Sequence, residues 1–138
     1  MTASSLACDR LAAEEGFRSK IYLDTVGKRT IGYGCNLDAG WSPGLARCVL
    51  EYQLEDVRQA LAGAWWYAGL DDARVSVILD LGFNMGTAGL LHFPKMLAAI
   101  GHKYWQGAHD ELLNSDAARM LPARYGALAR ILLTGVST

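Results

Sequence analysis

The chain has 138 residues, of which half are hydrophobic and a fifth are charged, so its composition excludes an intrinsically disordered chain. Thirteen basic and 14 acidic side chains give a formal net charge of −1, unlike the concentrated basic surface of a nucleic-acid binder. No apolar run approaches the roughly 18 residues of a membrane-spanning helix, and residues 1–15 lack a secretory-signal pattern. These features predict a soluble, cytosolic protein of one domain.

The cysteines and histidines offer little for covalent or metal chemistry. Cys8, Cys35 and Cys48 are an odd number at unrelated spacings, which favours a reducing compartment without a disulfide framework. The three histidines have no partner ligands at metal-binding spacing. We therefore expect neither a metal nor another cofactor.

The first predicted elements are a helix and a β-hairpin. Ser4 or Ser5 is a suitable N-cap for a helix that ends at Glu15, because Gly16 is a residue favoured just past a helix end. Beyond it, residues 18–34 change to a β-rich composition with many glycines.

Two β-rich runs in this segment predict the hairpin. They cover residues 20–23 and 29–33. The four residues between them begin with Asp24 and end with Gly27, the order that favours a type I turn. Because the hairpin is short, it needs packing from elsewhere to persist.

Helical periodicity dominates the remainder. Ser42 and Pro43 mark the start of a long helix that ends near Gly63. Its apolar stripe consists of Leu50, Leu54, Val57 and Leu61. Asp71 or Asp72 caps the following helix, whose predicted buried stripe is Val75, Ile78, Leu79, Gly82 and Phe83.

The second of these helices is predicted to end at residues 84–86, and shorter helices follow. Pro94, Gly101 and Pro122 divide this part of the chain. The last apolar stripe consists of Tyr125, Leu128, Ala129 and Leu132, and it closes at Thr134 and Gly135. Strands segregated from helices predict a mostly helical α+β fold.

Two carboxylates and a hydroxyl on the first elements form a candidate hydrolytic site. Glu15 occupies the last helical turn, where the helix dipole disfavours a negative charge and so favours a carboxyl group that keeps its proton. Asp24 lies at the hairpin turn, and a short hairpin folds Thr30 back near it. A proton donor, a water-orienting carboxylate and a helper hydroxyl are the groups that an inverting glycosidase requires.

Each of these residues also has an ordinary structural explanation. Asp24 is an ideal turn former, Glu15 suits a solvated helix end, and Thr30 is a common strand residue. Spacing alone does not decide between these explanations and catalysis.

Residues 11–34 resemble the phage-type lysozymes, the endolysin muramidases of glycoside hydrolase family 24 that are related to the T-even phage lysozyme. The family motif is Glu, eight residues, Asp, five residues and Thr, followed by Ile-Gly-x-Gly, and Glu15, Asp24 and Thr30 match every interval. The similarity continues through residues 82–86, 122–124 and 133–135.

The resemblance implies a role for each matched residue. Glu15 would protonate the β-1,4 glycosidic oxygen between N-acetylmuramic acid and N-acetylglucosamine in peptidoglycan. Asp24 would orient the attacking water, and Thr30 would assist it. The function implied is peptidoglycan hydrolysis for bacterial cell lysis.

The resemblance also implies substrate-binding residues. Phe83 and Asn84 would line the wall of the cleft opposite the carboxylates, with the Asn84 amide offered to an N-acetyl or hydroxyl group of a sugar. Gly34, in the glycine-rich run, would let the backbone approach the glycan. Core packing for Phe83 and strand bulging for Gly34 remain open.

The fold implied is that of one two-lobed lysozyme domain over residues 1–138. Residues 16–41 would form a small hairpin lobe, and residues 42–63 would form the connecting helix. Residues 1–15 and 64–138 would form the helical lobe.

The sequence departs from the family pattern at Cys35, where many relatives have His, and near Ala117, where many have an aromatic residue. These departures motivate an alternative, a wall-binding or phage structural module without turnover. Residues 65–67, Trp-Trp-Tyr, suit either packing at a lobe junction or stacking on a sugar.

The expected partner is a peptidoglycan glycan strand, with neither nucleic acid nor stable membrane insertion. The expected protein is a monomer in the host cytoplasm, and a separate holin would provide access to the wall. Because the net charge is near zero, attraction to an anionic wall must come from local cations. The candidates near the hairpin are Arg18, Lys20, Lys28 and Arg29.

Overall fold

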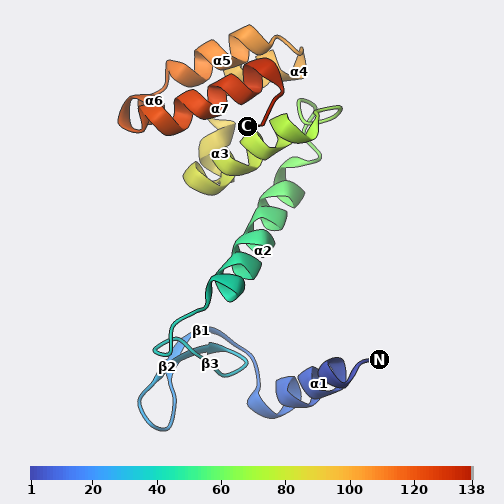
Figure 1. The fold of residues 1–138 in the computed structure, drawn as a ribbon, viewed down its shortest axis with the longest axis vertical. Coiled ribbons are helices and arrows are strands. Elements are labelled where there is room, and N and C mark those ends of the chain that lie inside the picture. Colours follow the sequence, from blue (N-terminus) through green and yellow to red (C-terminus); the bar gives the residue numbers. More distant parts are fainter. Residues whose placement is uncertain (138) are drawn as a thin grey trace. The chain divides into compact units, whose positions relative to one another are not determined.

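The structure is a computed structural model that describes residues 1–137, and it shows a mostly helical α+β protein (Figure 1). The predicted fold class is therefore confirmed. The chain divides into two compact units, Met1–Cys48 and Val49–Thr138, and each is described by itself.

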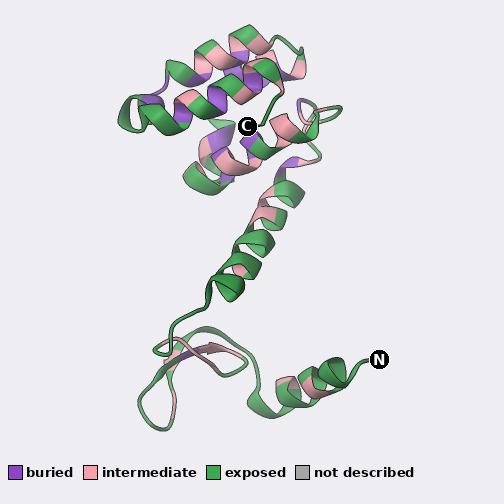
Figure 2. Ribbon diagram, in the orientation of Figure 1, coloured by how far each residue is buried: buried purple, intermediate pink, exposed green. Residues whose placement is uncertain are grey.

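The first unit begins with helix α1, Ala3–Glu15, which has no buried residue and is drawn mostly as exposed in Figure 2. Its N-cap is Thr2, so the prediction of Ser4 or Ser5 was wrong. The Thr2 hydroxyl accepts from the backbone N–H of Ser5, and the Ser5 hydroxyl accepts from the N–H of Thr2, both at 3.1 Å. Ser5 thus completes a capping box from the third helical position.

A three-stranded antiparallel sheet follows, in the order β1 (Arg18–Leu23), β2 (Arg29–Gly32) and β3 (Cys35–Asn36). The predicted hairpin of β1 and β2 is confirmed, and its turn is closed by a 3.0 Å bond from Gly27 N–H to the Asp24 carbonyl. Strand β3 was not predicted, because two residues carry too little pattern to identify a strand.

Helix α2 spans Pro43–Leu61 and includes the division between the two units. Its predicted start is confirmed, since the Ser42 hydroxyl accepts from the N–H of Leu45 at 3.2 Å. Burial increases along the predicted stripe, from an exposed Leu50 to a buried Leu61.

The second unit contains helix α3, Asp72–Leu91, capped by the Asp71 side chain. Gly86, at φ 79° and ψ 155°, breaks the helix where an end was predicted, but helical turns resume as far as Leu91. The predicted buried stripe is partly wrong, because Phe83 is 45% exposed. The buried residues of α3 are Val77, Ile78, Leu81, Gly82 and Leu90.

The error on α3 has a physical cause. Residues 75–83 are apolar around most of the helix circumference, so a 3.6-residue period fits two adjacent faces equally well. Contacts with other helices select the face that becomes buried.

Four shorter helices complete the described part of the unit, and the residues predicted to begin and end them are confirmed. Pro94 and Pro122 occupy first-turn positions, and Gly135 ends the last helix in the left-handed region at φ 71°. The helices are α4 (Pro94–Gly101), α5 (Trp105–Leu113), α6 (Asp116–Met120) and α7 (Pro122–Thr134). Helices α5 and α7 lie side by side (Figure 1).

The core of this unit is formed by α3 to α7 together with Leu61 of α2 and Trp66, and Figure 2 shows buried positions on these helices. Trp66 is buried in this core, whereas the adjacent Trp65 is 61% exposed and contacts the ring of His102. Within residues 1–137, no single helix is long and apolar enough to cross a membrane. Helices α3 and α4 have the length and apolar composition of a membrane-spanning segment only when they are taken together, and the chain bends by 104° between them.

Candidate active site

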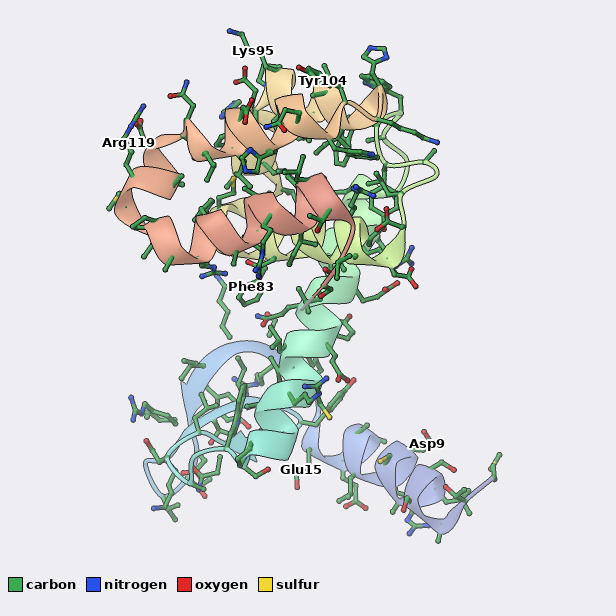
Figure 3. All side chains as sticks on the ribbon, turned by 45° about the horizontal axis from the view of Figure 1, so that its top comes forward. Asp9, Glu15, Phe83, Lys95, Tyr104 and Arg119 are labelled. Atoms are coloured by element: carbon green, nitrogen blue, oxygen red, sulfur yellow. The ribbon has the colours of Figure 1, made fainter. Side chains whose placement is uncertain are left out.

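Glu15 lies at the end of α1, where the chain turns into the sheet (Figure 3). Gly16 makes this turn at φ 70° and ψ 156°. The carboxyl group of Glu15 lies against Gly34, since a Cβ added to Gly34 would stand 3.3 Å from Glu15 Oε2. Gly34 also has φ +81°, a conformation that side-chain-bearing residues rarely adopt.

A ring contact joins the two segments that hold this pair. Phe17 follows the turn at Gly16, and Tyr33 precedes Gly34. Their ring centroids are 5.4 Å apart with planes tilted by 48°. The contact fixes the end of α1 against the turn between β2 and β3, and so helps to place Glu15 over Gly34.

Asp24 is held rigidly at the hairpin turn. Its Oδ1 accepts from the backbone N–H groups of Val26 and Lys28, at 2.9 and 2.8 Å. Within residues 1–137, no hydrogen bond to its second oxygen, Oδ2, is formed by another protein group. Asp24 therefore both forms the turn and presents a free carboxylate oxygen.

Thr30 is connected to Asp24 through the backbone of Lys28, to which both side chains hydrogen-bond. It is 3% exposed, the one buried residue of Met1–Cys48, all of which the structure describes. Its hydroxyl donates to the carbonyl of Lys28 at 3.0 Å, while the N–H of Lys28 donates to Asp24. Because the hydroxyl proton is used, the Thr30 oxygen is oriented as an acceptor.

A second carboxylate, Asp38, stabilises this sheet and was missed by sequence reasoning. Its Oδ2 accepts from the backbone N–H of Arg29, and its Oδ1 accepts from the guanidinium of the same residue, both at 2.8 Å. The backbone N–H and then the guanidinium hold the pKa of Asp38 below its ordinary value. These two hydrogen bonds connect the segment after β3 to β2, the strand that carries Thr30.

The other two predicted site residues, Phe83 and Asn84, are consecutive on α3 in the second unit, and Figure 3 labels Phe83. Phe83 lines a hollow of about 330 Å³. The other residues of its lining are Leu50, Leu54, Ser76, Leu79, Asp80 and Arg124. Its exposed ring offers a flat apolar surface to this hollow, which a buried core residue would not.

Asn84 is exposed, and its side-chain oxygen accepts a 2.5 Å bond from the hydroxyl of Tyr125. Sequence reasoning assigned Tyr125 to the core and missed this contact. The available signal was the hydroxyl itself, because a tyrosine in an apolar stripe needs a partner for its O–H group.

The two positions that the sequence analysis singled out as unusual, Cys35 and Ala117, have ordinary surroundings. Cys35 is a half-buried free thiol on β3, paired in register with Ile31. Ala117 is half-buried and packs against the core of the second unit. Cys8 and Cys48 are free and exposed.

In the first unit, Glu15 therefore lies against Gly34, and Asp24 and Thr30 are each bonded to the backbone of Lys28. Together they supply a carboxyl group that can give a proton, and a carboxylate and a hydroxyl oxygen that can hold a water molecule. These are the groups needed for acid-catalysed hydrolysis of an acetal.

Comparison with known proteins gives one family match. The model of the phage lysozyme family matches residues 12–124 of the chain. The match includes all six candidate site residues, from Glu15 to Asn84. No curated protein matches the chain.

Proposed function

The chain belongs to the phage lysozyme family, and from this premise we propose that it hydrolyses the β-1,4 bond between N-acetylmuramic acid and N-acetylglucosamine in peptidoglycan. The main support is the position of Glu15, whose carboxyl group lies against Gly34 in the same small unit as Asp24 and Thr30.

Glu15 is the general acid. Its exposed carboxyl group gives a proton to the glycosidic oxygen as the bond to the anomeric carbon breaks. The backbone of Gly34 leaves room for the carboxyl group, and its lack of a side chain lets a sugar ring approach the same point. The leaving sugar departs with its hydroxyl group restored.

Asp24 and Thr30 hold the nucleophilic water. The water donates one hydrogen bond to Asp24 Oδ2 and a second to Thr30 Oγ1, because both oxygens retain accepting capacity. Its oxygen attacks the anomeric carbon, and Asp24 takes the proton released. The negative charge of Asp24 also stabilises the oxocarbenium-like transition state, and the stereochemistry at the anomeric carbon is inverted.

Phe83 and Asn84 bind the glycan in this proposal. The exposed Phe83 ring packs on an apolar sugar face, and the Asn84 amide bonds a polar substituent. Their contribution is to affinity, whereas Glu15 and Asp24 carry the reaction.

Substitution of Glu15→Gln tests the proposal, with Glu14→Gln, at the adjacent and also exposed residue, as its matched control. The first variant lacks the acid, so the rate of clearing of purified cell walls should fall by at least about 100-fold. The control should clear walls at the rate of the unaltered protein. Both side chains are exposed, so both variants should unfold as the unaltered protein does.

Product analysis completes the test. Hydrolysis predicts new reducing muramic ends. Anhydro ends would instead show a lytic transglycosylase reaction and contradict hydrolysis. Undiminished clearing by Glu15→Gln would refute the assignment of the acid. Wall binding by the unaltered protein without any new ends would instead support a wall-binding or structural module.

A further inference from the structure

The contact between Tyr125 and Asn84 joins the core of the second unit to its surface. Tyr125 lies on α7 and is 1% exposed, whereas Asn84 lies on α3 and is exposed. The hydroxyl reaches Asn84 Oδ1 at 2.5 Å across 41 positions of sequence. A buried group therefore fixes the orientation of an exposed amide.

The Tyr125 hydroxyl is the donor of this hydrogen bond, and Asn84 Oδ1 is the acceptor. Burial raises the pKa of the Tyr125 hydroxyl, the positive charge of Arg124 opposes this effect, and the negative charge of Asp80 adds to it more weakly. The hydroxyl therefore carries its proton at neutral pH, and the geometry directs it to the carbonyl oxygen of Asn84. Because the Asn84 carbonyl oxygen accepts, the amide nitrogen is directed away from Tyr125 with its two N–H groups available.

We propose that Tyr125 is a positioning residue that fixes Asn84 as a hydrogen-bond donor and so selects N-acetylated over N-deacetylated glycans. The inference rests on the proposed function for its substrate. An acetamido group presents a carbonyl oxygen, which accepts from the Asn84 amide. The ammonium group of a deacetylated sugar only donates, so it finds no partner there.

Without the Tyr125 hydroxyl, the Asn84 amide is free to turn over. Its carbonyl oxygen can then face the glycan and accept from an ammonium group. Tyr125→Phe should therefore reduce the preference for acetylated glycans, whereas a purely structural role would weaken the binding of both glycans equally.

The experiment measures equilibrium binding of soluble acetylated and chemically N-deacetylated glycan strands in the Glu15→Gln background, where turnover does not interfere. Tyr125→Phe should weaken binding of the acetylated strand roughly three- to tenfold, the effect of one hydrogen bond. Binding of the deacetylated strand should change by less than about twofold. Tyr104→Phe, an exposed tyrosine of the same unit, should leave both affinities unchanged.

A double variant and a second substitution complete the design. In an Asn84→Ala background, Tyr125→Phe should have no further effect on the preference, because its influence passes through Asn84. Asn84→Asp leaves Tyr125 in place but presents an acceptor, so it should favour the deacetylated strand. It therefore tests the proposal even where Tyr125→Phe fails to fold.

Three outcomes would overturn the inference. These are an equal loss of affinity for both strands in Tyr125→Phe, a further loss of preference in the Asn84→Ala background, and an unchanged preference in Asn84→Asp. Release of reducing ends by the protein with Glu15 intact is measured separately. Selective binding without such release would refute the proposed hydrolysis and keep the role of Tyr125.

Discussion

Glycine at position 34 is required for two independent reasons. Its φ of +81° is costly for any residue with a side chain, and a Cβ there would stand 3.3 Å from Glu15 Oε2. The first reason concerns stability and the second concerns the position of the carboxyl group. Gly40, in the same unit, allows the two effects to be measured separately. It has a similar φ of +76°, but no atom lies within 4 Å of a Cβ added there.

We predict that Gly34→Ala and Gly40→Ala lower the free energy of unfolding by similar amounts, about 1–2 kcal/mol each. Only Gly34→Ala should also reduce wall hydrolysis by about tenfold or more, because its methyl group displaces the Glu15 carboxyl group. Denaturant unfolding and wall clearing measure the two effects. Equal activity of the two variants would show that the close approach of Glu15 to Gly34 has no role in hydrolysis.

At the scale of single residues, the sequence identified candidate groups but not their surroundings. The match of Glu15, Asp24 and Thr30 to a family motif identified the candidate groups, and their catalytic roles stay predictions. In the structure, Asp24 and Thr30 each hydrogen-bond to the backbone of Lys28. The partner of Asn84 could not be predicted, because Tyr125 is 41 positions away and only packing of α7 against α3 brings it there.

The hairpin turn shows how an element can combine a structural and a chemical role. Asp24 Oδ1 accepts two backbone N–H groups and so stabilises the turn, which is the ordinary explanation for an aspartate at this position. Its Oδ2 is the oxygen assigned to the water. The two explanations are therefore compatible, and a substitution can separate them.

Asp24→Asn should keep the turn and lose the reaction. Asparagine retains the Oδ1 acceptor, so the free energy of unfolding should change by less than about 0.5 kcal/mol, whereas Asp24→Ala should lower it by about 1–2 kcal/mol. Both variants should hydrolyse walls at least about 100-fold more slowly, because neither can take a proton from water. Stability is measured by denaturant unfolding and the rate by release of reducing ends. Full activity of Asp24→Asn would leave the carboxylate with only its role in the turn.

Elements with local signals were predictable, and those fixed by tertiary contacts were not. The Asp24 to Gly27 turn and the Ser42–Pro43 helix start depend on neighbouring residues alone, and both are confirmed. Strand β3 exists through pairing with β2, and the buried face of α3 is chosen by its neighbours. The N-cap of α1 was misplaced because three residues with side-chain hydroxyls, Thr2, Ser4 and Ser5, lie within four positions.

Across the whole molecule, the net charge of −1 conceals a difference between the two units. Met1–Cys48 contains six basic and five acidic side chains, and Val49–Thr138 contains seven and nine. Ion pairing lowers the number of cations that are available to attract an anionic wall, because Arg29 lies 2.7 Å from Asp38. The guanidinium of Arg18 lies 4.7 Å from the centre of the Tyr22 ring.

Lys20 and Lys28 therefore remain the main candidates for wall attraction, because no ion pair within residues 1–137 includes them. In the Glu15→Gln background, Lys20→Gln combined with Lys28→Gln should weaken binding to purified walls roughly two- to fivefold at about 10 mM salt. At about 150 mM salt the difference should nearly vanish, since the Debye length falls to about 8 Å. Co-sedimentation with walls measures the bound fraction.

Lys95→Gln combined with Lys103→Gln provides the matched control, since it removes the same charge from the second unit. If the position of the charge matters, this pair should have a smaller effect than the hairpin pair at low salt. Equal effects would mean that net charge alone controls binding. Because the protein is nearly neutral, the salt dependence before substitution should itself be shallow, and a steep loss of binding between the two salt concentrations would contradict the assignment of attraction to a few local cations.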